Sequence, residues 1–223
     1  MIITFAKPNK PAYNVPKSYR PIQLLECMGK VVEKIVASRL LFDAGKYNLL
    51  PSTQFGGRPH LSCLDAGLSL VHDISTARKG GLVSALLTID IKGFFDHVQH
   101  RRLIWVLWHM GFPRQVCSWV LSFISDRAAT LNIDNSLSTF FDIDVGVPQG
   151  SPVSPVLACL YAAEPLFKLT NNPIFSGTGH PVGPRSYVDD LAFLAISDSP
   201  GENVITLGHT LYTALDCQGH SSP

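Results

Sequence analysis

The chain has 223 residues, of which 46% are hydrophobic, 16% charged and 9% aromatic, so global disorder is excluded and a core of its own is expected. No uncharged apolar run reaches about 18 residues, so we expect no membrane span. The first ten residues lack the apolar core of a secretory signal and the five cysteines form no Cys-x-x-Cys pair, so we expect an intracellular protein. The net charge is +1, but residues 1–60 carry nine Lys and Arg against three Asp and Glu, which suits a bound polyanion or, equally, a solvated basic surface.

The expected elements follow one another in an α+β order rather than in regular βαβ alternation. The four prolines between residues 7 and 21 predict an extended loop. Apolar residues at helical spacing predict helices at residues 24–41, 62–78, 100–110, 113–124 and 153–169, with a weak one after Ser197 and a polar tail from residue 218. Apolar runs predict strands at residues 82–91, 128–133 and 140–145 and on both sides of an acidic turn near residue 189, the first of them a buried central strand.

Three carboxylates occupy unusual places in this pattern. Asp90 ends the apolar run 82–91, and Asp189 and Asp190 form the tip of an apolar hairpin. An Asp at the end of a buried strand is costly unless it is paired or binds a cation, and clustered carboxylates repel one another until a divalent ion joins them. Hard oxygen ligands without a His or Cys set favour Mg²⁺, and two such ions suit phosphoryl transfer. The alternative is that Asp189 and Asp190 lie in an ordinary exposed turn.

A second motif, Gly146-Val147-Pro148-Gln149-Gly150-Ser151-Pro152, precedes the expected helix 153–169. Its Gly and Pro residues restrict the backbone, and Gln149 on such a turn can offer an uncharged amide to a nucleotide. Without further context the same loop is an ordinary entry into a helix, and the phosphate-loop pattern GxxxxGK[ST] is absent.

Five stretches in order resemble the reverse transcriptase domain of non-LTR (LINE-like) retrotransposons. They are Ser18-Tyr19-Arg20-Pro21-Ile22 followed by Gly29-Lys30, Gln54-Phe55-Gly56-Gly57-Arg58-Pro59, Asp90-Ile91-Lys92-Gly93-Phe94-Phe95-Asp96, the GVPQGSPVSPVL run, and Tyr187-Val188-Asp189-Asp190. The resemblance covers residues 17–196 and implies an RNA-directed DNA polymerase with an α+β fingers-palm fold, whose small antiparallel palm sheet packs on helices. It also implies an RNA template, a DNA primer, deoxynucleoside triphosphates, two Mg²⁺ ions and a nuclear location for the parent element.

The resemblance implies roles for individual residues. Asp90 and Asp189 would bind the two Mg²⁺ ions with Asp190 assisting, and Phe95 would exclude a ribose 2′-hydroxyl. Gln149 and Gly150 would contact the incoming nucleotide, Arg20 would lie near its triphosphate, and Lys30 and Arg58 would bind nucleic acid. The expected domains are a basic fingers part at 1–80, a palm at 81–197 and a weak helix with a polar tail at 198–223.

Two departures from the family pattern shape the remaining expectations. His60-Leu61-Ser62 stands where the family has Gly-Arg-Ser, which removes a positive charge. Only 33 residues follow Asp190, none of them Lys or Arg, so we expect the family's thumb to be missing and processive synthesis to be weak. The rival interpretations are a catalytically silent remnant that at most binds nucleic acid, and a Mg²⁺ nuclease, in which Phe95 and Gln149 would have no role.

Overall fold

The protein folds into two compact units, each assembled from two separate stretches of the chain. The computed structural model describes residues 2–13, 15, 18–133, 136–170 and 184–219. The first unit joins residues 1–42 and 93–161, and the second joins residues 43–92 and 162–223. This division concerns compactness alone, so the functional division into fingers and palm stays a prediction.

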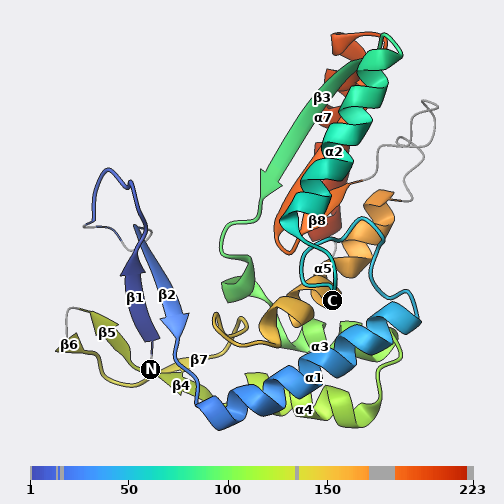
Figure 1. Cartoon of the computed structure of the whole chain (residues 1–223). Coiled ribbons are helices and arrows are strands. Elements are labelled where there is room, and N and C mark those ends of the chain that lie inside the picture. The colour runs from blue at the N-terminus through green and yellow to red at the C-terminus, as the bar shows by residue number, and fades with distance from the viewer. Residues whose placement is uncertain (1, 14, 16–17, 134–135, 171–183, 220–223) are drawn as a thin grey trace. The chain divides into compact units, whose positions relative to one another are not determined.

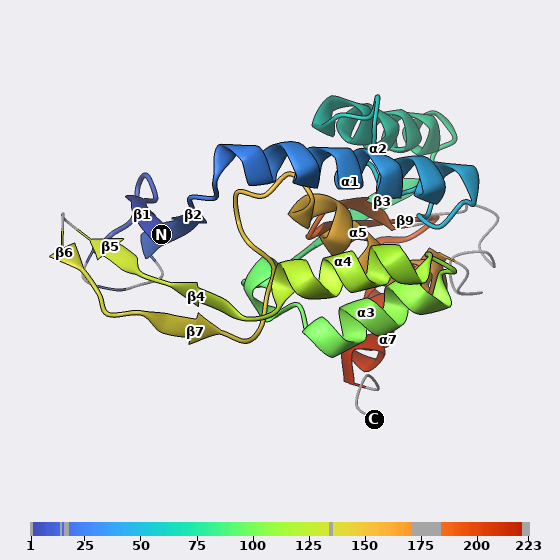
Figure 2. The ribbon, with the colours of Figure 1, turned by 90° about the horizontal axis from the view of Figure 1, so that it is seen from below.

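A small antiparallel sheet forms the centre of the second unit. Its described strands lie in the order β3 (Val83–Asp90), β9 (Asp190–Ser197) and β8 (Arg185–Tyr187). Successive side chains of β9 point to opposite faces, so Leu194 and Ile196 pack with Ala77 of α2 (Cys63–Lys79), whereas Phe193 packs toward α7 (Pro200–Gly219). Figure 2 shows these two helices on opposite sides of the strands. The strand that continues from the acidic turn is therefore the buried one.

One expectation about this sheet is wrong. The apolar run 82–91 does form a strand, β3, but it lies at the edge of the described sheet, and β9 occupies the centre. Leu86 is 46% exposed, whereas Phe193 and Leu194 of β9 are at most 1% exposed. Both strands are apolar, so the sequence does not reveal which of them receives a neighbour on each side.

The helix α2 begins at a capping box that the sequence contains as Ser62-x-x-Asp65. The Ser62 hydroxyl accepts a hydrogen bond from the Asp65 backbone N–H at 3.3 Å, and the Asp65 carboxylate accepts one from the Ser62 N–H at 2.7 Å. The Ser62 hydroxyl also donates to the Asp65 carboxylate at 2.6 Å, and this bond together with the one from the Ser62 N–H lowers the pKa of Asp65. The box fixes the start of α2 within one residue of the predicted boundary.

We expect Ser62→Ala to destabilise the chain by about 1 kcal/mol, because the Asp65 backbone N–H loses the hydroxyl that accepts its hydrogen bond. Urea unfolding followed by circular dichroism measures this change. Ser75→Ala is the matched control, since Ser75 is exposed within α2 and Ala favours a helix there. An equal midpoint for the Ser62→Ala variant and the unmodified chain would contradict the expectation.

The first unit contains a four-stranded sheet, a two-stranded ribbon and a helix pair. The sheet has the order β2-β1-β5-β6, and its β1–β5 pairing is parallel. The helices α3 and α4 pack on each other (Figure 2), and Leu103, Leu107 and Val120 on these helices are fully buried. The elements are β1 (Ile2–Ala6), β2 (Tyr19–Gln23), η2 (Phe94–His97), α3 (His100–His109), α4 (Arg114–Ile124), β4 (Arg127–Ala129), β5 (Leu131–Ile133), β6 (Ser136–Leu137) and β7 (Phe141–Ile143).

Two further helices, α1 (Cys27–Lys46) and α5 (Ser154–Thr170), each contain residues of both units. Figure 1 colours the chain from the N-terminus to the C-terminus. All six expected helices are present, although α1 begins three residues later than predicted and ends five residues later. The predicted loop 7–21 ends instead in β2, and β1 was not expected. The predicted turn at residues 134–135 lies outside the described residues. Among the described helices, none combines the length and apolar character that crossing a bilayer requires.

Candidate active site

The pairing of β3 with β9 brings the predicted carboxylates to one end of the second unit's sheet. Asp90 is the register partner of Asp190, and directly opposed residues project from the same face of an antiparallel pair. Tyr187 pairs with Asp190 on the other side, so the tip of the β8–β9 hairpin is Val188-Asp189 rather than Asp189-Asp190. Three carboxylates separated by about 100 positions of sequence are thereby placed at one sheet end.

The tip has an unusual backbone. Val188 has φ of 62°, in the left-handed region that a β-branched residue rarely adopts. Such a conformation costs of order 1–3 kcal/mol and persists only where the surroundings enforce it. The position of Asp189, the next residue, therefore depends on the contacts that hold Val188.

Asp189 is the carboxylate whose protonation is most affected by this arrangement. Partial burial raises its pKa, and the negative charges of Asp190 and Asp90 raise it further, against a backbone hydrogen bond that lowers it. The charges of both neighbours act on Asp189, in keeping with the strand register that places the carboxylates at one sheet end. Their oxygen donors suit Mg²⁺, which would relieve the repulsion. In the part of the chain that the structure describes, however, no three His, Cys, Asp or Glu side chains are already gathered into a metal-binding group.

The raised pKa of Asp189 predicts a pH-dependent stability. The folded chain binds a proton at this carboxyl more tightly than the unfolded chain does. The protonated carboxyl therefore makes its full contribution to the free energy of unfolding when the pH is below the ordinary pKa of Asp. This contribution is lost as the pH rises through the raised pKa of Asp189 in the folded chain. Without divalent ions, Asp189→Asn is expected to raise the urea midpoint at pH 7 and to change it less at pH 3. A lower midpoint at pH 7 would contradict this, and the exposed Asp198→Asn variant is the control.

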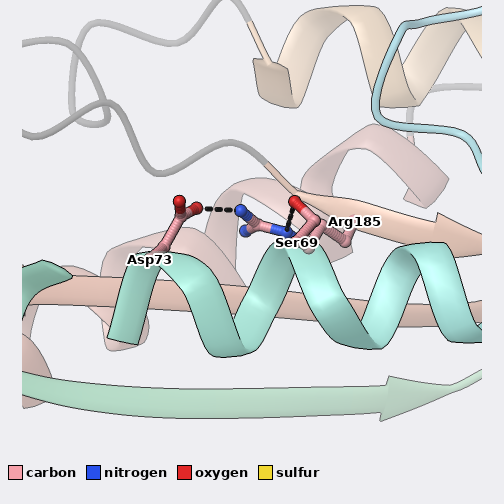
Figure 3. Close-up of polar contacts among 3 residues, drawn as sticks. All are labelled: Ser69, Asp73 and Arg185. Atoms are coloured by element: carbon pink, nitrogen blue, oxygen red, sulfur yellow. Dashed lines mark hydrogen bonds and ion pairs between the residues drawn. The ribbon is translucent and has the colours of Figure 1, made fainter. Parts of the chain in front are cut away.

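The hairpin is attached to α2 by an arginine that the sequence interpretation did not single out. Arg185, the first residue of β8, donates from Nε to Ser69 Oγ at 3.1 Å, and its Nη2 forms an ion pair with Asp73 (Figure 3). The Arg185 side chain is 12% exposed. Its position four residues before Asp189 was the available signal, but the sequence alone does not show that α2 carries its partners.

A second support comes from residues 53–56, which run beside β8. The Gln54 side chain is fully buried and accepts a hydrogen bond from Ser186 Oγ. Arg58, expected to contact nucleic acid, donates to the carbonyls of Pro51 at 3.1 Å and Gln54 at 3.4 Å. Arg58 thus stabilises the loop before it, and a contact with a template stays a prediction.

The predicted nucleotide-binding residues lie in the first unit, where the loop 146–152 contacts the start of η2. Val147 N–H donates to the Phe95 carbonyl at 2.8 Å, and Gln149 Nε2 donates to Asp96 Oδ1 at 2.8 Å. Gly146 has φ of 82°, and a Cβ there would lie 2.8 Å from the carbonyl oxygens of Phe95 and Asp96, so the loop requires Gly at this position. The loop 146–152 therefore contacts the segment that carries Phe95 and Asp96, and the nucleotide-binding roles of Phe95 and Gln149 stay predictions.

The remaining predicted residues lie around the same loop or on neighbouring elements. Gly150 approaches β2 closely, because a Cβ there would lie 2.8 Å from the Gln23 carbonyl, and Gln23 N–H donates to the Gln149 carbonyl at 2.9 Å. Arg20 is exposed on β2, and Lys30 is half-buried near the start of α1. The carboxylates and Arg58 belong to the second unit, and Arg20, Lys30, Phe95, Gln149 and Gly150 belong to the first.

Comparison with known proteins gives a consistent family. The sequence model described as "Reverse transcriptase (RNA-dependent DNA polymerase)" matches residues 6–215. A probable RNA-directed DNA polymerase from transposon BS of Drosophila melanogaster is 31% identical over 90% of this chain and 22% of its own length. The RNA-directed DNA polymerase from mobile element jockey of the same organism is 30% identical over 82% of this chain and 19% of its own length. The chain thus spans about a fifth of these relatives.

Solved structures support the fold at low sequence identity. Apo telomerase from Candida tropicalis superposes with a TM-score of 0.56 at 14% identity, over 79% of this chain and 36% of that one. Telomerase from Candida albicans gives 0.55 at 13% identity, over 87% of this chain and 38% of that one. These matches confirm the predicted α+β fold of the reverse transcriptase type.

Proposed function

The chain belongs to the reverse transcriptase family of RNA-dependent DNA polymerases, and from this we propose that its acidic sheet end catalyses nucleotidyl transfer. The observation that carries the proposal is the register of Asp90 opposite Asp190, with Asp189 on the adjoining strained turn. The substrates would be a DNA primer, an RNA template and deoxynucleoside triphosphates. For the parent element, we propose the nuclear location that the family resemblance implies.

The proposed metal ligands are Asp90 and Asp189, with Asp190 assisting. Two bound Mg²⁺ ions would supply charge stabilisation for the attacking and the leaving oxygen during in-line transfer. The chain itself holds the carboxylates on β3, β9 and the turn between β8 and β9, so their spacing is set by strand pairing. Partial burial of Asp189 limits its hydration and strengthens its interaction with a cation.

The proposed substrate contacts follow from the chemistry of five predicted residues, of which Arg58 belongs to the second unit and the others to the first. Arg20 offers a bidentate donor to the triphosphate, and Gln149 and Gly150 offer amide groups to the nucleotide. Lys30 and Arg58 would bind backbone phosphates without reading sequence. The Gln149 amide already donates to Asp96, so a nucleotide contact through this amide requires that bond to be shared or exchanged.

Addition of a single nucleotide tests the function without requiring processive synthesis. The purified 223-residue chain is mixed with a DNA primer on an RNA template, Mg²⁺ and one deoxynucleoside triphosphate. We expect the primer to gain one nucleotide, EDTA to stop the reaction and excess Mg²⁺ to restore it. If the primer gains no nucleotide at any Mg²⁺ or protein concentration while the chain is folded, the proposal is wrong.

The half-buried Phe95 is proposed to select the sugar. Its ring meets Phe94 edge-on at 6.1 Å between centroids, and its carbonyl is fixed by Val147. We expect Phe95→Ala to reduce discrimination against ribonucleotides by about 100-fold, measured as the ratio of kcat/KM for the two sugars. Phe140→Ala is the control, because Phe140 is 80% exposed. Unchanged discrimination in the Phe95→Ala variant would remove this role.

A further inference from the structure

The strained Val188-Asp189 turn is supported by a segment outside the hairpin, residues 53–56. Ser186 N–H donates to the Thr53 carbonyl at 3.0 Å, and Phe55 N–H donates to the Ser186 carbonyl at 2.8 Å. Gln54 and Ser186 form a parallel bridge between these two bonds. The backbone of residues 53–55 therefore continues the sheet for one position beyond β8.

Side chains reinforce this backbone contact. The Ser186 hydroxyl donates to Gln54 Oε1, and Gln54 Nε2 donates to the Gly56 carbonyl at 2.9 Å. Gln54 has no exposed surface, and Ser186 is 1% exposed. A buried amide whose oxygen and nitrogen both form hydrogen bonds restricts the positions of its bonding partners, because the loss of either hydrogen bond leaves an unsatisfied buried polar atom. Gln54 thus links β8 to Gly56.

Gly56 then contacts the turn itself. A Cβ at this position would lie 2.6 Å from the Val188 nitrogen, 2.8 Å from Val188 Cγ2 and 2.9 Å from the Tyr187 carbonyl carbon. Two of these neighbours are backbone atoms, which cannot move without moving the turn. Gly56 therefore lies directly against the residue whose φ of 62° sets the position of Asp189.

We propose that Gln54 and Gly56 are positioning residues for the carboxylate-bearing turn: they hold Val188 in its left-handed conformation and so fix Asp189. Their catalytic consequence rests on the proposed nucleotidyl transfer. They contact neither metal nor substrate and act through the backbone of residues 186–188. A displacement of about 1 Å at the reacting groups can reduce a rate about 100-fold, so a small shift of the turn is sufficient.

The sharpest test is Gly56→Ala compared with Gly67→Ala. Gly67 is exposed on α2 of the same unit, and a Cβ there meets no atom within 4 Å. For Gly56→Ala we expect kcat of single-nucleotide addition to fall about 100-fold, with little change in KM for the nucleotide or in primer–template affinity. Gly67→Ala should retain the kcat of the unmodified chain. Equal kcat for Gly56→Ala and Gly67→Ala would overturn the proposal.

The role of Gln54 is tested by a double-variant cycle with Ser186. Gln54→Met removes the acceptor of the Ser186 hydroxyl and the donor to the Gly56 carbonyl, whereas Ser186→Ala removes only the donor to Gln54 Oε1. Each variant should lower kcat about tenfold. The double variant removes both partners, so its loss should be clearly smaller than the product of the two single losses. Simple multiplication of the two losses would show that the Gln54–Ser186 bond does not position the turn.

Hydrogen–deuterium exchange separates failure of this proposal from failure of the proposed function. In Gly56→Ala, the amides of residues 187–190 should exchange about tenfold faster, while those of α3 and α4 should be unchanged. If the unmodified chain adds no nucleotide but this local acceleration is seen, the polymerase function is wrong and the positioning role stands. Unchanged exchange at residues 187–190 would overturn the positioning role whatever the activity.

Discussion

Asp189→Asn is expected to lower the rate of Mg²⁺-dependent nucleotide addition about a thousandfold. The neutral amide keeps the size of the side chain but removes the negative charge that would hold the cation, and metal stabilisation of the transferring phosphoryl group is worth several kcal/mol. The strained turn and the opposed Asp90–Asp190 pair remain in the variant, so the loss should appear in kcat. Single-turnover addition at saturating nucleotide measures it.

Asp198→Asn provides the matched control for this substitution. Asp198 is exposed and lies just beyond the end of β9 opposite to the candidate site, so its substitution leaves the candidate site unchanged. The control should retain the rate of the unmodified chain. Should Asp189→Asn retain more than about a tenth of that rate, Asp189 cannot be a ligand on which the transfer depends. Together with the stability expectation at pH 7, this predicts a variant that is more stable and inactive.

Phe193→Ala is expected to destabilise the second unit by about 3–5 kcal/mol, the largest stability effect that we predict. Phe193 is fully buried in β9, where it packs with Leu169, Leu87, Leu207 and neighbouring apolar side chains. Truncation removes the ring from the contact between the sheet and α7 and leaves a cavity that the paired strands cannot close. Urea unfolding measures the change, with hydrogen exchange at β3 and β9 to assign it to this unit.

Two comparison variants make the Phe193 result interpretable. Phe140→Ala removes the same ring from a site that is 80% exposed and should change stability by less than about 0.5 kcal/mol. Phe193→Leu retains most of the apolar volume and should fall between the unmodified chain and Phe193→Ala. A loss below about 1 kcal/mol in Phe193→Ala would show that the second unit does not depend on this core.

Local chemistry made several elements predictable from the sequence. Ser62 and Asp65 mark the start of α2 because their capping bonds are made within four residues. Asp90 was expected to meet Asp189 and Asp190 because Asp90 ends an apolar run and the other two form the tip of an apolar hairpin. The register places Asp90 opposite Asp190. The combination of Gly and Pro in the loop 146–152 likewise predicted a tight turn before α5.

Long-range pairing explains what the sequence did not reveal. β1 pairs in parallel with β5, more than 120 positions away, and both strands are too short to be recognised from their own composition. β3 and β9 are similarly apolar, so the edge strand could not be distinguished from the central one. At the site, Gln54 and Gly56 stood within a quoted motif, but their contacts with Ser186 and Val188 cross more than 120 positions.

The discontinuous second unit has a consequence for biosynthesis. β3 leaves the ribosome about 100 residues before its partner β9, which at about 5–20 residues per second is an interval of roughly 5–20 s. During that time α2 can form on its own capping box and cover one face of β3, but the hydrogen-bonding edge of β3 has no partner. The nascent chain therefore presents an open apolar strand until β9 is made, and this interval is when a ribosome-associated chaperone would matter most for its yield.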